Sequence, residues 1–178
     1  YKTTKVGVLG AGMMGAGIAY VTASRGIQVI LKDVSLETAE KGKAYSQKIL
    51  DKKVTQGRMT VEQRDQVLSL ITATATCEDL QDCDLMIEAV FENPALKAQV
   101  TQEVEPYLLH DGVMASNTST LPIGELAQAS KNEANFIGLH FFSPVDKMQL
   151  VEIIKGQNTS PETLAKAFDF VQQIGKTP

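Results

Sequence analysis

A glycine-rich segment near the start of the chain, GAGMMG at positions 10–15, constrains the fold more than any other feature of the sequence. It follows residues 5–9 (KVGVL), a short apolar run of strand length, and precedes residues 16–24, which are rich in small, helix-compatible side chains. A G-x-G-x-x-G pattern alone is a weak signal. The order of strand, glycine loop and helix makes it specific, because this is the arrangement of a dinucleotide-binding βαβ unit.

The three glycines have separate roles in such a unit. Gly10 allows the tight turn that leaves the strand, Gly12 lets a pyrophosphate approach the backbone, and Gly15 lets the helix pack closely. Residues 28–32 (QVILK) predict a second strand that ends in Asp33, about 20 residues beyond the loop, where an acidic residue is expected. A carboxylate there binds ribose hydroxyls and repels a 2′-phosphate, which favours NAD over NADP. The alternative role for this aspartate is to cap the next helix.

Strand-like and helix-like segments alternate through the rest of the chain. Short apolar or β-branched runs predict further strands at residues 70–75, 84–90, 113–116, 136–140 and 150–154. Helical composition marks residues 94–108, 123–129 and 161–174, and Gly175 stands where a helix-terminating glycine is expected. The alternation predicts an α/β fold with a doubly wound, mostly parallel sheet of the Rossmann type.

The segment of about residues 36–70 departs from this simple alternation. Its first part has helical composition after a candidate N-cap at Ser35, and Gly57 interrupts it. Thr60 and Gln63 then have the spacing of a capping box at the start of a second helix. We therefore predict a helical hairpin inserted after the second strand. The residues alone favour equally a solvated excursion and an arm that reaches a substrate.

The composition is that of an ordinary globular protein and excludes several classes of partner. Of the 178 residues, 43% are hydrophobic and 21% are charged, and the net charge is −4. No basic stripe is present, so we expect no nucleic-acid partner. No apolar run approaches the roughly 18 to 20 residues of a membrane span. Cys77 and Cys83 lack C-x-x-C spacing, so we expect reduced packing residues in an intracellular protein, and no metal site.

Polar side chains gather where the predicted strands end, which is where open α/β sheets bind ligands. They comprise Asp33, Glu92 with Asn93, residues 117–120, and His140. Oxidation of an alcohol needs a base with a pKa near neutral, and a histidine meets that requirement. His140 ends an apolar strand, and Glu152 in the next strand can return beside it, whereas His110 is expected in a surface loop. The residues alone thus indicate an NAD-dependent alcohol or hydroxyacid oxidoreductase, with a purely structural histidine as the alternative.

Five segments, in order, carry a resemblance to a known family: GAGMMGAGIA (10–19), EAVFEN (88–93), ASNTSTL (115–121), GLHFFSPV (138–145) and LVEII (150–154). Over essentially its whole length the chain resembles the NAD-binding domain of the L-3-hydroxyacyl-CoA dehydrogenases. Its run FFSPVDKMQL (141–150) is most similar to the dehydrogenase part of multifunctional fatty acid oxidation α-subunits. Many relatives carry Asn where this chain has Ser143.

The resemblance implies an activity and a role for individual residues. His140 takes the proton of the 3-hydroxyl group while hydride passes from C3 to the nicotinamide, Glu152 orients that histidine, and Ser119 hydrogen-bonds the reacting oxygen. NAD is the implied cofactor, and its implied binding residues are Gly10, Gly12, Met13, Met14, Gly15, Asp33, Ala89, Val90, Phe91, Glu92, Lys97, Asn117, Ser119 and Ser143.

The resemblance also implies the wider architecture. Residues 1–178 correspond to one NAD-binding domain, the hairpin contributes to a cleft for the acyl-CoA substrate, and Ser46 and Lys53 match substrate contacts when a small gap is allowed. The family's C-terminal helical domain lies beyond Pro178, so we expect this piece to bind NAD with little or no turnover. The parent chain is expected to be multifunctional and to associate with a thiolase subunit. We expect it in the cytoplasm of a bacterium, with a mitochondrial location as the alternative.

Two alternatives remain open. A related β-hydroxyacid dehydrogenase would usually employ a lysine base from a later helix. A non-catalytic NAD-binding module, for sensing or scaffolding, would need none of His140, Ser119 and Glu152, because nucleotide binding alone requires no such group.

Overall fold

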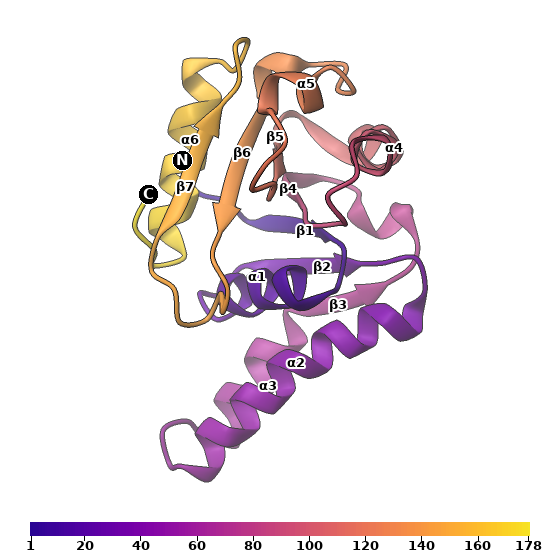
Figure 1. Ribbon diagram of the computed structural model, residues 1–178. Coiled ribbons are helices and arrows are strands. Elements are labelled where there is room, and N and C mark those ends of the chain that lie inside the picture. The colour runs from indigo at the N-terminus through magenta and orange to yellow at the C-terminus, as the bar shows by residue number, and fades with distance from the viewer.

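The computed structural model of residues 1–178 contains one seven-stranded sheet with the order β3-β2-β1-β4-β5-β6-β7 (Figure 1). Strands β1 to β6 are parallel, and β7 is antiparallel to β6. The strands are β1 (Lys5–Leu9), β2 (Gln28–Lys32), β3 (Ile71–Thr74), β4 (Cys83–Glu88), β5 (Leu108–Ser116), β6 (Phe136–Phe141) and β7 (Val151–Lys155). This confirms the predicted mostly parallel sheet of the Rossmann type.

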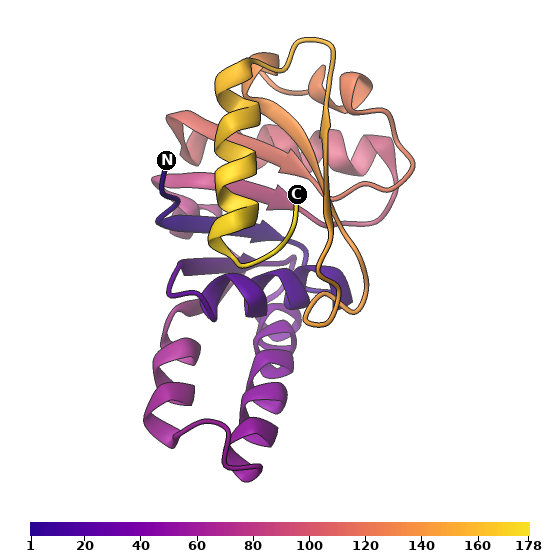
Figure 2. The same ribbon diagram turned by 90° about the vertical axis from the view of Figure 1, so that its left-hand side faces the viewer.

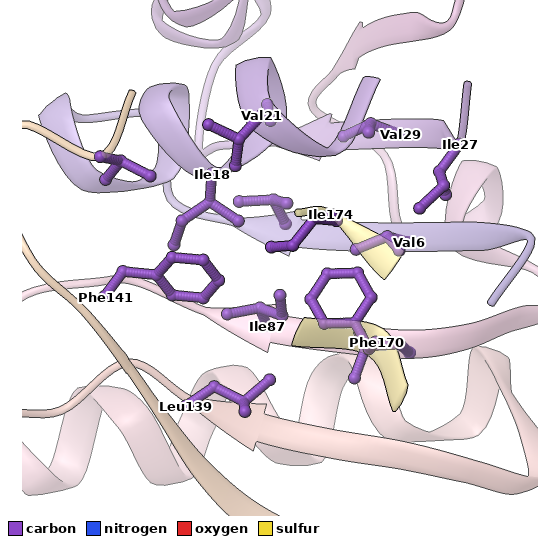
Figure 3. Close-up of a cluster of buried hydrophobic side chains, with 14 of the residues drawn as sticks. Val6, Ile18, Val21, Ile27, Val29, Ile87, Leu139, Phe141, Phe170 and Ile174 are labelled. Carbon is purple, nitrogen blue, oxygen red and sulfur yellow. The ribbon is translucent and has the colours of Figure 1, made fainter. Parts of the chain in front are cut away.

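Helices cover both faces of the sheet because its central strands are apolar on both sides. The helices are α1 (Met13–Ala23), α2 (Leu36–Thr55), α3 (Val61–Ser69), α4 (Pro94–Val104), α5 (Ile123–Ala127) and α6 (Pro161–Gln173). Alternate strand residues such as Val6, Ile87 and Leu139 pack with α1 and α6 in the larger core cluster (Figure 3). Met86 and Met114, on the other face, pack with α4 and α5. None of the helices is both long enough and apolar enough to cross a membrane.

Helices α2 and α3 form the predicted pair of helices and project away from the sheet (Figures 1 and 2). The side chain of Ser35 accepts a hydrogen bond at the start of α2, and Thr60 and Gln63 form the complete capping box at the start of α3. Gly42 brings α2 close to the glycine loop, since a Cβ there would lie 2.8 Å from the Cβ of Ala11. The hairpin is therefore attached beside the loop that was predicted to bind the cofactor.

The prediction was wrong where a helix gives way to a strand. We predicted a helix over residues 94–108, but α4 ends at Val104 and a 3₁₀ helix (Glu105–Tyr107) follows. Pro106 cannot continue an α-helix because it lacks an N–H group and its ring obstructs the preceding turn. Strand β5 consequently begins at Leu108, and His110 lies exposed within this strand and not in a loop. Two short 3₁₀ helices, Cys77–Leu80 and Glu133–Asn135, were also not predicted.

Candidate functional site

The glycine loop joins β1 to α1 and has the geometry that close phosphate binding requires. A Cβ at Gly15 would lie 1.7 Å from the carbonyl oxygen of Gly10, so loop and helix are in direct contact. Gly10 itself has a φ of 101°, in the region that favours glycine. A Cβ at Gly12 would meet no atom within 4 Å, and no side chain caps the helix at this residue. The helix N-terminus thus faces open space, as an anion-binding site requires.

Asp33 lies at the end of β2, beside this loop. One carboxylate oxygen accepts a hydrogen bond from the backbone N–H of Ala11 at 2.8 Å, and the other from the N–H of Val34 at 2.6 Å. A cavity of about 160 Å³ lies between this strand end and α4, and Gly10 and Asp33 both line it. The arrangement fits the adenosine end of a dinucleotide.

A second cavity, of about 420 Å³, opens where β4, β5 and β6 end. Half of the predicted site residues meet here, and its lining consists of Met14, Ala89, Val90, Phe91, Glu92, Asn117, Ser119, His140, Phe141, Phe142 and Ser143. Val90 lines both this cavity and the smaller one, so the two are adjacent. The largest cavity, about 690 Å³, lies near the amino end of β5 and contains none of the predicted site residues. Because His140, Ser119 and Glu92 all line the second cavity, we place the site there.

His140 and Glu152 are directly opposite each other in the antiparallel pairing of β6 and β7. The Nδ1 atom of His140 lies 2.9 Å from Oε1 of Glu152, and the histidine side chain is 17% exposed. The ring of Phe142 packs against that of His140, and the two ring centroids are 4.5 Å apart. A carboxylate at Nδ1 fixes the tautomer and orientation of the ring, and leaves Nε2 to exchange a proton.

The loop after β5 connects the neighbouring strand ends. Asn117 donates its backbone N–H to the carbonyl oxygen of Glu88 at 2.8 Å, and its side-chain oxygen accepts the N–H of Phe141 at 2.8 Å. Ser119 is exposed on the cavity wall, two residues farther along. Asn117 therefore fixes the position of the serine loop relative to the strand that carries His140.

Glu92 organises the same loop with a single oxygen atom. Its Oε2 accepts hydrogen bonds from the hydroxyls of Thr118 (2.7 Å) and Thr120 (3.0 Å) and from the N–H groups of Ser119 (3.2 Å) and Thr120 (3.3 Å). Burial alone would raise the pKa of Glu92, but the hydrogen bonds from Thr118, Lys97 and Thr120 outweigh it and hold the pKa at about 2. The carboxylate is therefore ionised throughout the neutral range.

Lys97 was predicted to line the cofactor site, but the structure buries it behind the cavity wall. Its side chain is 2% exposed, and Nζ contacts Glu88 at 2.6 Å, Glu92 at 3.1 Å and the carbonyl oxygen of Val90 at 3.1 Å. Sequence reasoning missed Glu88 and Ser116, which join this cluster through a 2.6 Å hydrogen bond. The one signal available was a glutamate directly after the apolar residues 85–87 of β4.

The two predicted substrate contacts on the hairpin are differently placed. Ser46 is fully buried in α2 and its hydroxyl has no hydrogen-bond partner, so the structure does not present it to a substrate. Lys53 extends over the ring of Tyr20, with Nζ 5.7 Å from the ring centroid. Met13 is exposed, and its sulfur accepts a weak hydrogen bond from Ser143 at 3.6 Å, which joins the glycine loop to the loop after β6.

The loop between β6 and β7, residues 142–150, is held from several directions. Val145 packs against α1, where a Cβ at Gly17 would lie 2.8 Å from it. Tyr45 of α2 donates a hydrogen bond to Asp146 at 3.2 Å, and Nζ of Lys176 donates to the carbonyl oxygen of Val145 at 2.7 Å. The hairpin, the first helix and the chain end thus all contact the loop that joins His140 to Glu152.

Comparison with known proteins identifies the family and the fold. The family described as "3-hydroxyacyl-CoA dehydrogenase, NAD binding domain" matches residues 5–178. A fatty acid oxidation complex subunit alpha from Shewanella frigidimarina is 46% identical over 99% of this chain, which spans 25% of that protein. The crystal structure of (S)-3-hydroxybutyryl-CoA dehydrogenase from Ralstonia eutropha superposes with a TM-score of 0.95 at 36% identity, over 99% of this chain and 62% of that one. The 3-hydroxybutyryl-CoA dehydrogenase of Escherichia coli also gives 0.95, at 32% identity, over 100% of this chain and 38% of that one.

Proposed function

The chain belongs to the family of 3-hydroxyacyl-CoA dehydrogenase NAD-binding domains, and on that premise we propose that it forms the NAD-binding and proton-transfer part of an enzyme that oxidises L-3-hydroxyacyl-CoA to 3-ketoacyl-CoA. The observation that carries the proposal is the hydrogen-bonded His140–Glu152 pair at a cavity shared with Ser119. A domain that only bound a nucleotide would have no need of this pair.

The residues present fit the cofactor that the family description names. The glycine loop and the N-terminus of α1 would hold the pyrophosphate, and Asp33 would accept hydrogen bonds from the adenosine ribose. Bound NAD⁺ supplies the acceptor for the hydride that leaves C3 of the substrate. The open space around Gly12 and the position of Asp33 are the structural observations that support this assignment.

His140 would accept the proton of the 3-hydroxyl group at Nε2. Glu152, at Nδ1, would hold the ring in the orientation that allows this transfer and would stabilise the imidazolium that results. Ser119 would hydrogen-bond the reacting oxygen from the other side of the cavity. Base and hydrogen-bond donor would then act on the same oxygen atom.

The substrate and partners follow from the relatives and are proposed on that basis. The matched subunit alpha belongs to a fatty acid oxidation complex, and the solved relatives are named for acyl-CoA substrates. We propose that the hairpin forms one side of the acyl-CoA cleft, that residues outside this chain complete it, and that the protein assembles with a thiolase subunit in the cytoplasm. Both cysteines are free, as a reducing compartment would leave them.

The decisive experiment compares the protein that carries this chain with its His140→Gln variant in oxidation of NADH by acetoacetyl-CoA. We expect the rate to fall by roughly two orders of magnitude or more, with NADH binding retained, because general acid–base catalysis contributes that much and His140 would donate the proton in this direction. His110→Gln is the matched control, since this histidine is exposed on β5 and does not line the cavity that contains His140. Equal activity of the two variants would remove His140 from the mechanism and favour a non-catalytic NAD-binding module.

A further inference from the structure

Glu88 is a buried carboxylate to which neither the sequence analysis nor the proposed reaction gives a role. It ends β4 and is 1% exposed. Its Oε1 accepts a hydrogen bond from the hydroxyl of Ser116 at 2.6 Å. Its Oε2 accepts hydrogen bonds from Nζ of Lys97 at 2.6 Å and from the N–H of Val90 at 2.9 Å. It is paired with β1 on one side and β5 on the other, directly below the cavity edge.

Such a group does not need to be there for stability. Removing the Glu88 carboxylate and the Lys97 ammonium from water is costly, and well-packed apolar side chains of similar volume often stabilise a protein as well or better. What a charged cluster adds is geometry, because each group must lie where its partners can satisfy it. The question is therefore what Glu88 and Lys97 hold in position.

The cluster leads directly to the nicotinamide end of the proposed NAD site. Lys97 bridges Glu88 to Glu92 across a distance of 3.1 Å from Nζ to the second carboxylate. Glu92 in turn receives the four hydrogen bonds from residues 118–120, which include the N–H of Ser119. The carbonyl oxygen of Glu88 also accepts the N–H of Asn117 at the base of this loop. The serine loop is thus connected to the Glu88 carboxylate through Lys97 and Glu92, and to the Glu88 main chain at Asn117.

We propose that Glu88 is a positioning residue that acts through Lys97 and Glu92 to fix the 117–120 loop around the nicotinamide end of the cofactor. This inference rests on the proposed function only in requiring that NAD binds at this edge of the sheet. The adenosine end is held by other groups, since Asp33 and the glycine loop make no hydrogen bond or ion pair with Glu88, Lys97 or Glu92. The two ends of the cofactor site should therefore respond differently when Glu88 is changed.

The test measures affinity for NADH and for ADP-ribose, which lacks nicotinamide, using the protein that carries this chain. Glu88→Gln is expected to weaken NADH binding roughly tenfold, the loss associated with one charge-assisted interaction, and to change ADP-ribose binding by less than about twofold. Lys97→Met should weaken NADH similarly, and the double variant should lose no more than either single variant, because the residues act in series.

Glu105→Gln is the matched control. Its carboxylate accepts the hydroxyl of Ser130 and the N–H of Lys131, but at the opposite end of β5, so both ligands should bind it normally. If Glu88→Gln does not fold, Ser116→Ala removes one hydrogen bond to the same carboxylate and should reproduce the selective loss on a smaller scale. Equal weakening of NADH and ADP-ribose, or unchanged NADH binding, would overturn the inference. A parent protein that bound neither ligand would overturn the proposed function as well.

Discussion

The glycine loop after β1 and the serine loop after β5 lie at the same edge of one sheet, yet they are shaped by opposite means. The first has few side chains, and its conformation is set by close packing of backbone against backbone, as between Gly15 and Gly10. The second is held by charged side chains from three segments, the buried Glu88 and Lys97 and the partly exposed Glu92. The contrast suggests that the adenosine end depends on space and the nicotinamide end on charge.

Gly15→Ala should give the largest effect on the glycine loop. The new Cβ would lie 1.7 Å from the carbonyl oxygen of Gly10, so the loop must move away from α1. We expect a loss of about 3 kcal/mol or more in the free energy of unfolding, as for severe overpacking, together with loss of NADH binding. Chemical denaturation and NADH titration measure the two effects. A variant with unchanged stability would contradict the account of this loop.

Gly12→Ala should separate binding from stability. No atom lies within 4 Å of the added Cβ, so the midpoint of thermal unfolding should not change. The methyl group would occupy the space assigned to the pyrophosphate, and NADH should bind roughly tenfold more weakly or worse, about 1.4 kcal/mol. Normal NADH affinity in this variant would show that the phosphates do not bind over the helix N-terminus.

The serine loop should be sensitive to acid through the carboxylate of Glu92. The pKa of Glu92 is lowered to about 2 from its ordinary value of 4.5, so its contribution to stability is fully present above the unfolded-state pKa. That contribution is lost as the pH falls from about 4.5 towards 2, because protonation then favours the unfolded chain. We expect Glu92→Gln to flatten part of this fall in an unfolding series from pH 6 to pH 2.5. An identical profile in both proteins would mean that Glu92 does not carry it.

The smallest expected effect distinguishes two hydroxyls that donate to the same Glu92 oxygen. Thr118 is buried and Thr120 is exposed, at hydrogen-bond distances of 2.7 Å and 3.0 Å. Thr118→Val should cost about 1 kcal/mol in the free energy of unfolding and Thr120→Val clearly less, since water can replace an exposed partner. Equal costs from urea denaturation would show that burial does not strengthen this cluster.

The two loops also differ in how well the sequence predicted them. The glycine loop, the alternation of strands and helices, and the first two helices after β2 could be predicted from local patterns of glycine, apolar residues and caps. The proximity of His140 and Glu152 followed from two consecutive strands. The Glu88–Lys97 contact could not be predicted in the same way, because its geometry depends on how α4 packs over β4.

Other differences have equally physical causes. Ser46 is polar, but its position on the buried side of α2 was set by packing that helical periodicity did not reveal. The early start of β5 depended on Pro106 ending α4, a local signal that was outweighed in our prediction by helical composition around it. Local sequence patterns thus predicted the strands and helices well and the charged contacts of the site poorly.

The pairing of His140 with Glu152 is a matter of strand register and not of distance along the chain. Deleting one residue inside β7 would turn the glutamate to the opposite face of the sheet, since side chains alternate along a strand. Adding or removing residues in the turn at 142–150 leaves that ladder intact, provided that Val145 keeps its place against α1. A change in length is therefore acceptable in the turn but not in the strand. A graft or a deletion placed in the turn would keep His140 and Glu152 in contact.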